Sequence, residues 1–256
     1  MKAKARPDNA VFGEAWELLF APPVAHRGLW SPAGAPENSL AAFQAACAGG
    51  YGIELDVQLT RDGEAVVFHD RSLGRMCGVE GKLADASLAE LRELRLAGTD
   101  ETIPTLTEVL AEVGHRALVQ IELKTPFGEV GALEKRVCEV LIDHNGPTCV
   151  IGFNPYSHAW FAAHHPQILR GLDSYSYRNN ETLAREQRAA YAALEHVGLA
   201  KPHFLALGLD IVGGEPAQKL RARGMPVVAW TVRDAEQQTI CAAHADNIIF
   251  EGFTPA

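Results

Sequence analysis

The sequence predicts an α/β fold in which one compact domain forms a closed parallel (β/α)₈ barrel, the TIM-barrel architecture. Short apolar runs alternate along the chain with longer segments of helical periodicity, as repeated β–α units do. There are eight candidate strands, and the 256 residues match the ~250 that are typical of this fold. No Pro/Ser-rich linker or low-complexity tract divides the chain. An open, doubly wound sheet is the alternative architecture.

The elements follow one another at regular intervals. In chain order, strands are expected at residues 24–26, 53–57, 118–123, 149–153, 169–172, 204–207, 227–230 and 248–250. Helices are expected at residues 39–48, 130–143, 157–164, 181–196, 216–222 and 235–244. Two more helices should begin at Ser87 and Thr105, because each stands three residues before a glutamate in the spacing of a capping box.

We expect residues 1–22 to form an N-terminal extension and residues 23–256 to form the barrel domain. The start of the chain lacks the uninterrupted apolar segment of about 7–15 residues that marks a signal peptide. No window approaches the ~20 apolar residues of a membrane span. The five cysteines are scattered without close pairing, which indicates reduced thiols rather than a disulfide framework or a zinc ribbon. These features predict a soluble, cytoplasmic protein.

The composition excludes some classes of protein. Hydrophobic residues make up 47% and charged residues 21% of the chain, which excludes intrinsic disorder as the main state. The formal net charge of -9 argues against nucleic acid as a partner and against stable membrane association. A small-molecule partner bound in a local basic pocket is compatible with this charge. Nothing in the sequence indicates an oligomeric state.

Two acids on one strand are the first sign of a functional site. Glu54 and Asp56 are two residues apart, so their side chains share one face of the strand. The pair Asp62-Gly63 predicts a two-residue hairpin turn, in which His69 lies directly opposite Asp56. An exposed polar strand face is the alternative interpretation.

Glu122 and Lys124 share a face at the C-terminal end of another apolar strand. That end of the strands carries the active site in a (β/α)₈ barrel. Glu54, Asp56 and Glu122 together form a set of hard oxygen ligands, which suits Mg²⁺ or Ca²⁺ rather than a thiophilic metal. A solvated strand face is again the alternative for the Glu122–Lys124 pair alone.

The first strand ends in His26-Arg27-Gly28. A histidine at this place can carry a proton near neutral pH. An arginine can bind an anionic oxygen through its fork of donors, and a glycine allows a tight turn. The tripeptide alone is a weak signal, but its combination with the acidic motifs is much less frequent by chance.

With these motifs in order, the sequence resembles the glycerophosphodiester phosphodiesterase family. The motifs that carry the resemblance are His26-Arg27-Gly28, Pro36-Glu37-Asn38-Ser39, Glu54-Leu55-Asp56, His69-Asp70, Glu122-Leu123-Lys124 and Trp230-Thr231-Val232. They span the chain from Val24 to Phe250. The resemblance implies the barrel fold and hydrolysis of glycerophosphodiesters to glycerol 3-phosphate and an alcohol, with a divalent cation.

The resemblance also implies roles for single residues. They are a general acid/base pair of His26 and His69, metal ligands Glu54, Asp56 and Glu122, and charge-stabilising Arg27 and Lys124. Trp230 would form an apolar wall for the glycerol or alcohol moiety, although a plain core tryptophan is an alternative. The implied route has two steps, in which a neighbouring substrate hydroxyl attacks phosphorus and water then opens the cyclic phosphate.

The sequence departs from the family pattern in its last strand, where Phe250-Glu251 stands in place of the usual Thr-Asp. The segment between His69 and Glu122 is short, so we expect no extra lobe there. Asn38 or Ser39 would either order the site or only cap the following helix. Two other functions remain open: a lysophospholipase D-like phosphodiesterase that acts on a lipid diester, and a catalytically silent barrel that binds a phosphorylated polyol.

Overall fold

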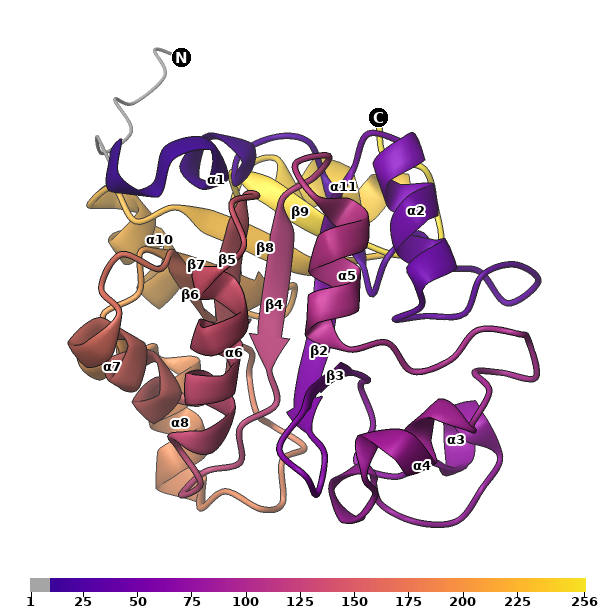
Figure 1. Ribbon diagram of the computed structural model, residues 1–256. Coiled ribbons are helices and arrows are strands. Elements are labelled where there is room, and N and C mark those ends of the chain that lie inside the picture. The colour runs from indigo at the N-terminus through magenta and orange to yellow at the C-terminus, as the bar shows by residue number, and fades with distance from the viewer. Residues whose placement is uncertain (1–9) are drawn as a thin grey trace.

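The computed structural model describes residues 10–256 and confirms the predicted barrel (Figure 1). Eight parallel strands form a ring in the order β1-β9-β8-β7-β6-β5-β4-β2, which the pairing of β1 with β2 closes. They are β1 (Val24–His26), β2 (Gly52–Leu59), β4 (Val119–Leu123), β5 (Thr148–Gly152), β6 (Arg170–Ser174), β7 (Phe204–Gly208), β8 (Val227–Val232) and β9 (Asn247–Phe250). A short strand, β3 (Ala65–Val67), pairs antiparallel with β2 outside the ring.

Helices join the strands and cover the outside of the barrel. The longer ones are α2 (Leu40–Ala48), α5 (Leu106–Val113), α6 (Ala132–Ile142), α7 (Pro155–His164), α8 (Arg185–Ala192), α10 (Glu215–Ala222) and α11 (Ala235–Cys241). Short helices are η1 (Ala10–Phe12), α1 (Gly13–Leu18), α3 (Gly74–Cys77), η2 (Leu83–Asp85), α4 (Leu88–Arg92) and α9 (Val197–Ala200). Both predicted capping boxes form, at Ser87 and at Thr105. None of the helices within residues 10–256 has the length and apolarity needed to cross a bilayer.

The core has two layers, as the alternation of side chains along barrel strands requires. The outer layer lies between the strands and the helices and includes Leu55, Val57 and Ile121. The inner layer fills the barrel near the N-terminal ends of the strands. Trp16 and Leu19, in and just after α1, are buried in this inner layer. Helix α1 therefore closes the end of the barrel opposite to the ends of the arrows in Figure 1.

A small lobe stands where the sequence predicted only short loops, so that prediction was wrong. Residues 70–104 carry α3, η2 and α4, which lie in Figure 1 at the end of the barrel toward which β2 and β4 point. The lobe has its own buried cluster: Val66, Phe68, Leu73, Met76, Leu83, Leu91, Leu96 and Ile103. Two of these side chains lie on or just after β3, so part of the core of the lobe comes from the barrel. A short segment is therefore enough to form the lobe.

The predicted register of the hairpin after β2 was wrong by one residue. Phe68, not His69, lies opposite Asp56, and the Phe68 N–H donates to the Asp56 carbonyl oxygen (2.9 Å). The N–H of Thr60 donates to the carbonyl oxygen of Glu64 (2.9 Å), so the loop has three residues, and its closing glycine has φ +85°. A three-residue loop that ends in a left-handed glycine is a common hairpin, which the two-residue interpretation of Asp-Gly overlooked.

Candidate active site

The pocket of interest has a volume of about 240 Å³ and lies at the C-terminal ends of the barrel strands. Seven of the eight residues that the sequence predicted for the site line it: His26, Arg27, Glu54, His69, Glu122, Lys124 and Trp230. The eighth, Asp56, is fully buried and forms ion pairs with Arg27 and Lys124. The structure therefore brings together side chains that are up to 204 positions apart in the sequence, from 26 to 230.

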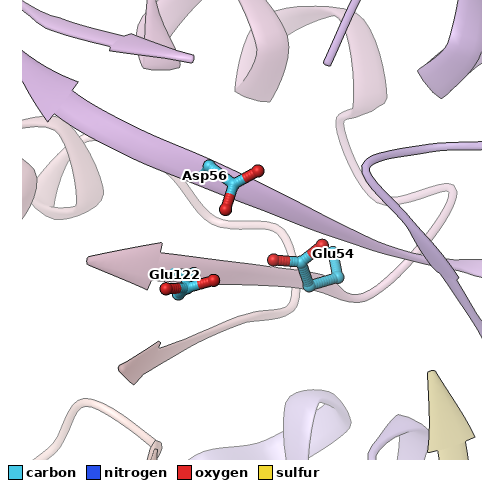
Figure 2. A group of neighbouring side chains, drawn as sticks. All are labelled: Glu54, Asp56 and Glu122. Carbon is cyan, nitrogen blue, oxygen red and sulfur yellow. The ribbon is translucent and has the colours of Figure 1, made fainter. Parts of the chain in front are cut away.

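The three predicted metal ligands form one cluster of acids. Glu54, Asp56 and Glu122 each offer a carboxylate oxygen, and these oxygens lie within 4.8 Å of one another. Figure 2 shows the three side chains on two neighbouring strands, Glu54 and Asp56 on β2 and Glu122 on β4. The strand register produces the cluster, because Asp56 and Glu122 are direct partners across β2 and β4. All three side chains are buried.

The proximity and burial of the three acids shift their pKa values in different directions. Burial, followed by repulsion from Asp56 and Glu122, raises the pKa of Glu54 well above its usual value. Burial also raises the pKa of Glu122, to about 7. Burial acts in the same direction on Asp56, but the charges of Lys124 and Arg27 hold the pKa of Asp56 well below its usual range. Such a cluster is suited to hold a cation, because a cation removes the repulsion between the carboxylates.

Two cationic side chains border the acids. Lys124 Nζ lies 2.7 Å from Asp56 Oδ1 and 2.8 Å from Glu122 Oε1. The charges of these acids outweigh burial and raise the pKa of Lys124 above its usual value. Arg27 has a left-handed backbone (φ 58°), and its N–H donates to Glu54 Oε2 (3.0 Å). Both cations remain charged and line the pocket.

The Pro-Glu-Asn-Ser motif orders the site and also caps a helix, so both interpretations of it hold. Ser39 accepts a hydrogen bond from the Ala42 N–H and is the N-cap of α2. Asn38 donates from Nδ2 to Asp56 Oδ2 (2.8 Å). Glu37 accepts a hydrogen bond from Arg27 (2.8 Å).

His26 is held by a carboxylate that the sequence marked only as atypical. Its Nδ1 donates to Oε2 of Glu251 (2.6 Å), because an ionised carboxylate can only accept. This bond also lowers the pKa of Glu251. Arg233 Nε lies 3.3 Å from the other Glu251 oxygen. The bond leaves His26 Nε2 beside the acid cluster, 3.9 Å from Glu54 Oε2.

His69 is positioned by the turn that follows β3. The Gln58 amide donates to the carbonyl oxygens of three successive residues, Phe68, His69 and Asp70 (2.7, 3.2 and 2.9 Å). His69 Nδ1 donates to Asp70 Oδ1 (2.7 Å). Burial lowers the pKa of His69, so its imidazole is neutral at pH 7. His69 therefore lies in the predicted pocket, although not through the predicted strand register.

Arg75 connects the lobe to both sides of the site. It donates to Asp70 Oδ2 from Nε (2.6 Å) and to Glu37 Oε1 from a terminal nitrogen (2.7 Å). The bond from Arg75 lowers the pKa of Asp70 to about 2. Because Asp70 holds His69 and Glu37 holds Arg27, one lobe residue supports two pocket side chains.

Aromatic rings form the other side of the pocket. Trp230 and Phe153 line the pocket, and their rings meet edge to face, with centroids 5.6 Å apart. Tyr175 lies behind them, 5.7 Å from Phe153 and 6.3 Å from Trp230. Trp230 therefore lies in the wall of the pocket, and its contact with a glycerol or alcohol moiety stays a prediction.

Sequence reasoning missed four residues of this site: Gln58, Arg75, Asp173 and Glu251. Asp173 resembles Glu122 in position, since it is an acid near the C-terminal end of a buried barrel strand. Glu251 follows β9 directly and could have been found in the same way. Gln58 and Arg75 carry no comparable sequence signal, because their contacts depend on the hairpin and the lobe.

An acidic cluster that could hold a cation, beside basic side chains and histidines, suits an enzyme that acts on an anionic ester, which is the class of protein that the fold and the pocket define. Comparison with known families then gives a match to the model of the Glycerophosphoryl diester phosphodiesterase family over residues 26–251. The chain belongs to this family of phosphodiester hydrolases, and the resemblance noted in the sequence is confirmed.

Individual relatives span most of the chain. A glycerophosphodiester phosphodiesterase from Caldanaerobacter subterraneus is 30% identical, over 88% of this chain and 92% of the relative. Human glycerophosphodiester phosphodiesterase 1 is 39% identical, over 86% of this chain and 74% of the relative. Among solved structures, an Oleispira antarctica phosphodiesterase in complex with the product sn-glycerol-3-phosphate has a TM-score of 0.78 at 26% identity, over 92% of this chain and 94% of that one.

Proposed function

We propose that the protein hydrolyses glycerophosphodiesters to glycerol 3-phosphate and an alcohol, with the help of a divalent cation. The observation that carries this proposal is a pocket in which two histidines and two cationic side chains lie with Glu54 and Glu122 of the buried acid triad. The third acid, Asp56, forms ion pairs with both cationic side chains. The product bound to the Oleispira antarctica relative supports the choice of glycerol 3-phosphate.

Glu54, Asp56 and Glu122 are the residues that would hold the cation. Their donor set consists only of carboxylate oxygens, which fits Mg²⁺ or Ca²⁺. When bound, the cation would supply positive charge to the phosphoryl oxygens. Lys124 and Arg27 add two fixed positive charges at the same wall of the pocket, where they stabilise charge that develops on those oxygens.

His26 and His69 divide the proton transfers between them. In-line displacement at phosphorus requires a base for the nucleophile and an acid for the leaving group. Each ring is fixed through Nδ1 by a carboxylate, Glu251 for His26 and Asp70 for His69, so Nε2 is the atom left to exchange a proton with substrate. In the two-step route, one histidine takes the proton of a neighbouring substrate hydroxyl while the other gives a proton to the leaving alcohol. The two then exchange roles: the second takes a proton from water, and the first returns its proton to the substrate oxygen as the cyclic phosphate opens.

The direct test is an assay of the purified protein with a panel of glycerophosphodiesters, in which release of glycerol 3-phosphate is followed with and without EDTA. We expect cation-dependent release. Binding of glycerol 3-phosphate without any turnover would instead support a silent binding barrel. Turnover only of diesters that bear a lipid chain would support the lysophospholipase D-like alternative.

We also propose the cytoplasm as the location of the protein. All five cysteines are unpaired. Burial raises the pKa of the Cys138 thiol to about 12, so this group stays protonated and unreactive. Such thiols suit a reducing compartment.

Replacement of Glu251 should lower turnover, because Glu251 fixes the His26 ring. We expect kcat to fall about 10-fold in Glu251→Gln, which keeps an acceptor for Nδ1, and about 100-fold in Glu251→Ala, which does not. Steady-state kinetics on one glycerophosphodiester would measure kcat for the wild type and the two variants. Glu236→Ala, at an exposed acid of α11, is the control. Equal kcat values in the Gln and Ala variants and the wild type would contradict the role of Glu251.

Replacement of Arg75, a residue of the lobe, should lower turnover. We expect Arg75→Ala to lower kcat about 10-fold, because both Asp70 and Glu37 lose a hydrogen-bond donor. Arg71→Ala, at an exposed arginine of the same lobe, should leave kcat unchanged. An equal loss in both variants would indicate a general effect on the lobe and not the contact with the site.

A further inference from the structure

Asp173 is a buried carboxyl group in the pocket that the steps above do not use. It belongs to β6, which is four strands from β1 around the ring of eight and therefore faces His26 across the barrel. Its side chain is 2% exposed and lines the pocket. Within residues 10–256 its carboxyl group forms no hydrogen bond or ion pair, and the Oδ2 atom is buried without a partner.

A carboxyl group in this situation weakens the fold. Buried polar groups are nearly always hydrogen-bonded, because leaving one unpaired costs its full desolvation free energy. Burial and then repulsion from Glu122 raise the pKa of Asp173 well above its usual value, which shows how unfavourable the charged form is here. An apolar residue would fill this place in β6 at lower cost. A cost of this kind is typical of a residue that has its partner in a ligand.

The surroundings of Asp173 indicate what the ligand offers. Phe153 and Trp230 line the same pocket as an aromatic wall, and Trp230 Nε1 is a second buried polar atom without a partner in the described chain. One unpaired acceptor and one unpaired donor beside apolar rings match a polyol, since each hydroxyl both donates and accepts while its C–H groups pack against rings. Arg27 and Lys124, the side chains proposed to bind the phosphoryl group, directly follow β1 and β4, and neither strand is next to β6 in the ring.

We propose that Asp173 is a specificity-determining residue that hydrogen-bonds a hydroxyl of the glycerol moiety of the substrate. This inference rests on the proposed function and adds to it the contact by which the glycerol part is recognised. A hydroxyl pairs with the carboxyl group in either protonation state. An ammonium group, the other partner that a carboxyl group beside aromatic rings would suit, has no acceptor for the unpaired Trp230 Nε1 donor, whereas a hydroxyl has one.

The test compares two ligands that carry the same phosphate charge. Binding of glycerol 3-phosphate and of methyl phosphate, which has no alcohol hydroxyl, is measured calorimetrically with the cation-loaded wild type, Asp173→Leu and Asp173→Asn. Phosphocholine, which carries an ammonium group, is measured in the same way as a third ligand. We expect Asp173→Leu to weaken glycerol 3-phosphate about 10- to 100-fold and to leave methyl phosphate unchanged. Asp173→Asn keeps polar atoms and should lose less. Asp210→Asn, at an exposed acid after β7, should bind both ligands as the wild type does.

Each other result overturns the proposal. Equal losses of affinity for both ligands would show that Asp173 acts on phosphate binding or on the stability of the fold. Unchanged affinity for both would show that Asp173 does not contact the ligand. If Asp173→Leu bound phosphocholine more weakly than the wild type but bound glycerol 3-phosphate equally well, Asp173 would be a partner of an ammonium group instead. The melting temperature of Asp173→Leu should equal or exceed that of the wild type, and a fall in both variants would reveal a structural role. Since the readout is binding, it stays informative even if no glycerophosphodiester is hydrolysed.

Discussion

Removal of divalent cations with EDTA is expected to abolish turnover, and added Mg²⁺ or Ca²⁺ is expected to restore it. The physical reason is the buried triad, in which burial and repulsion between the acids raise the pKa of Glu54 well above its usual value and burial raises that of Glu122 to about 7. The two fixed cations, Lys124 and Arg27, do not balance three carboxylates and a phosphodiester together. Full turnover in excess EDTA, with metal analysis showing no bound ion, would refute the proposed cation.

The same argument predicts the effect of single substitutions in the triad. Glu54→Gln, Asp56→Asn and Glu122→Gln should each lose affinity for the cation by about 10-fold or more, since each removes a negative charge from the ligand set. The cation-free variants at Glu54 and Glu122 should be at least as stable as the wild type, because repulsion in the cluster is relieved. Calorimetric binding and thermal unfolding measure the two effects. Glu64→Gln, at an acid half exposed beyond β2, is the control. Unchanged cation binding in all three variants would show that the triad is misassigned.

The barrel and most of the site could be predicted from the sequence because both depend on local patterns. Eight apolar runs at regular spacing are enough to predict a parallel barrel, and a parallel barrel places the C-terminal end of every strand around one pocket. Glu54 and Asp56 share a strand face, and Glu122 ends the neighbouring strand in space. Their proximity therefore follows from strand order alone, without knowledge of any side-chain conformation.

The remaining parts depend on contacts that the sequence does not encode locally. The hairpin register depends on whether Asp62-Gly63 closes a two- or a three-residue loop, and the hydrogen bond of Thr60 Oγ1 to Asp62 (2.6 Å) favours the longer loop. The lobe needed few residues of its own because it packs against β3. A closed barrel places β9 beside β1, but the hydrogen bond between Glu251 and His26 also depends on the directions of the two side chains, which strand order does not determine.

Alanine at either histidine is expected to lower turnover by about 10²–10⁴-fold, which is the usual contribution of a general acid or base. His26→Ala and His69→Ala should keep the cation, because neither side chain belongs to the acid cluster. Steady-state kinetics and calorimetric cation binding measure the two effects separately. His164→Ala, at an exposed histidine of α7, is the control. Near wild-type rates for both variants on a diester with a poor leaving group would contradict the acid–base roles.

The leaving group separates the two roles. His26 ends β1 and His69 lies in the turn after β3, so the two histidines reach the pocket from different elements. An alcohol with a high pKa needs a proton as it departs, whereas a nitrophenolate needs almost none. A diester with a nitrophenyl leaving group should therefore restore the rate of the variant that lacks the acid, and it should not restore the variant that lacks the base. Equal rescue of both variants would mean that neither histidine serves the leaving group alone, and the division of proton transfers between His26 and His69 would have to be abandoned.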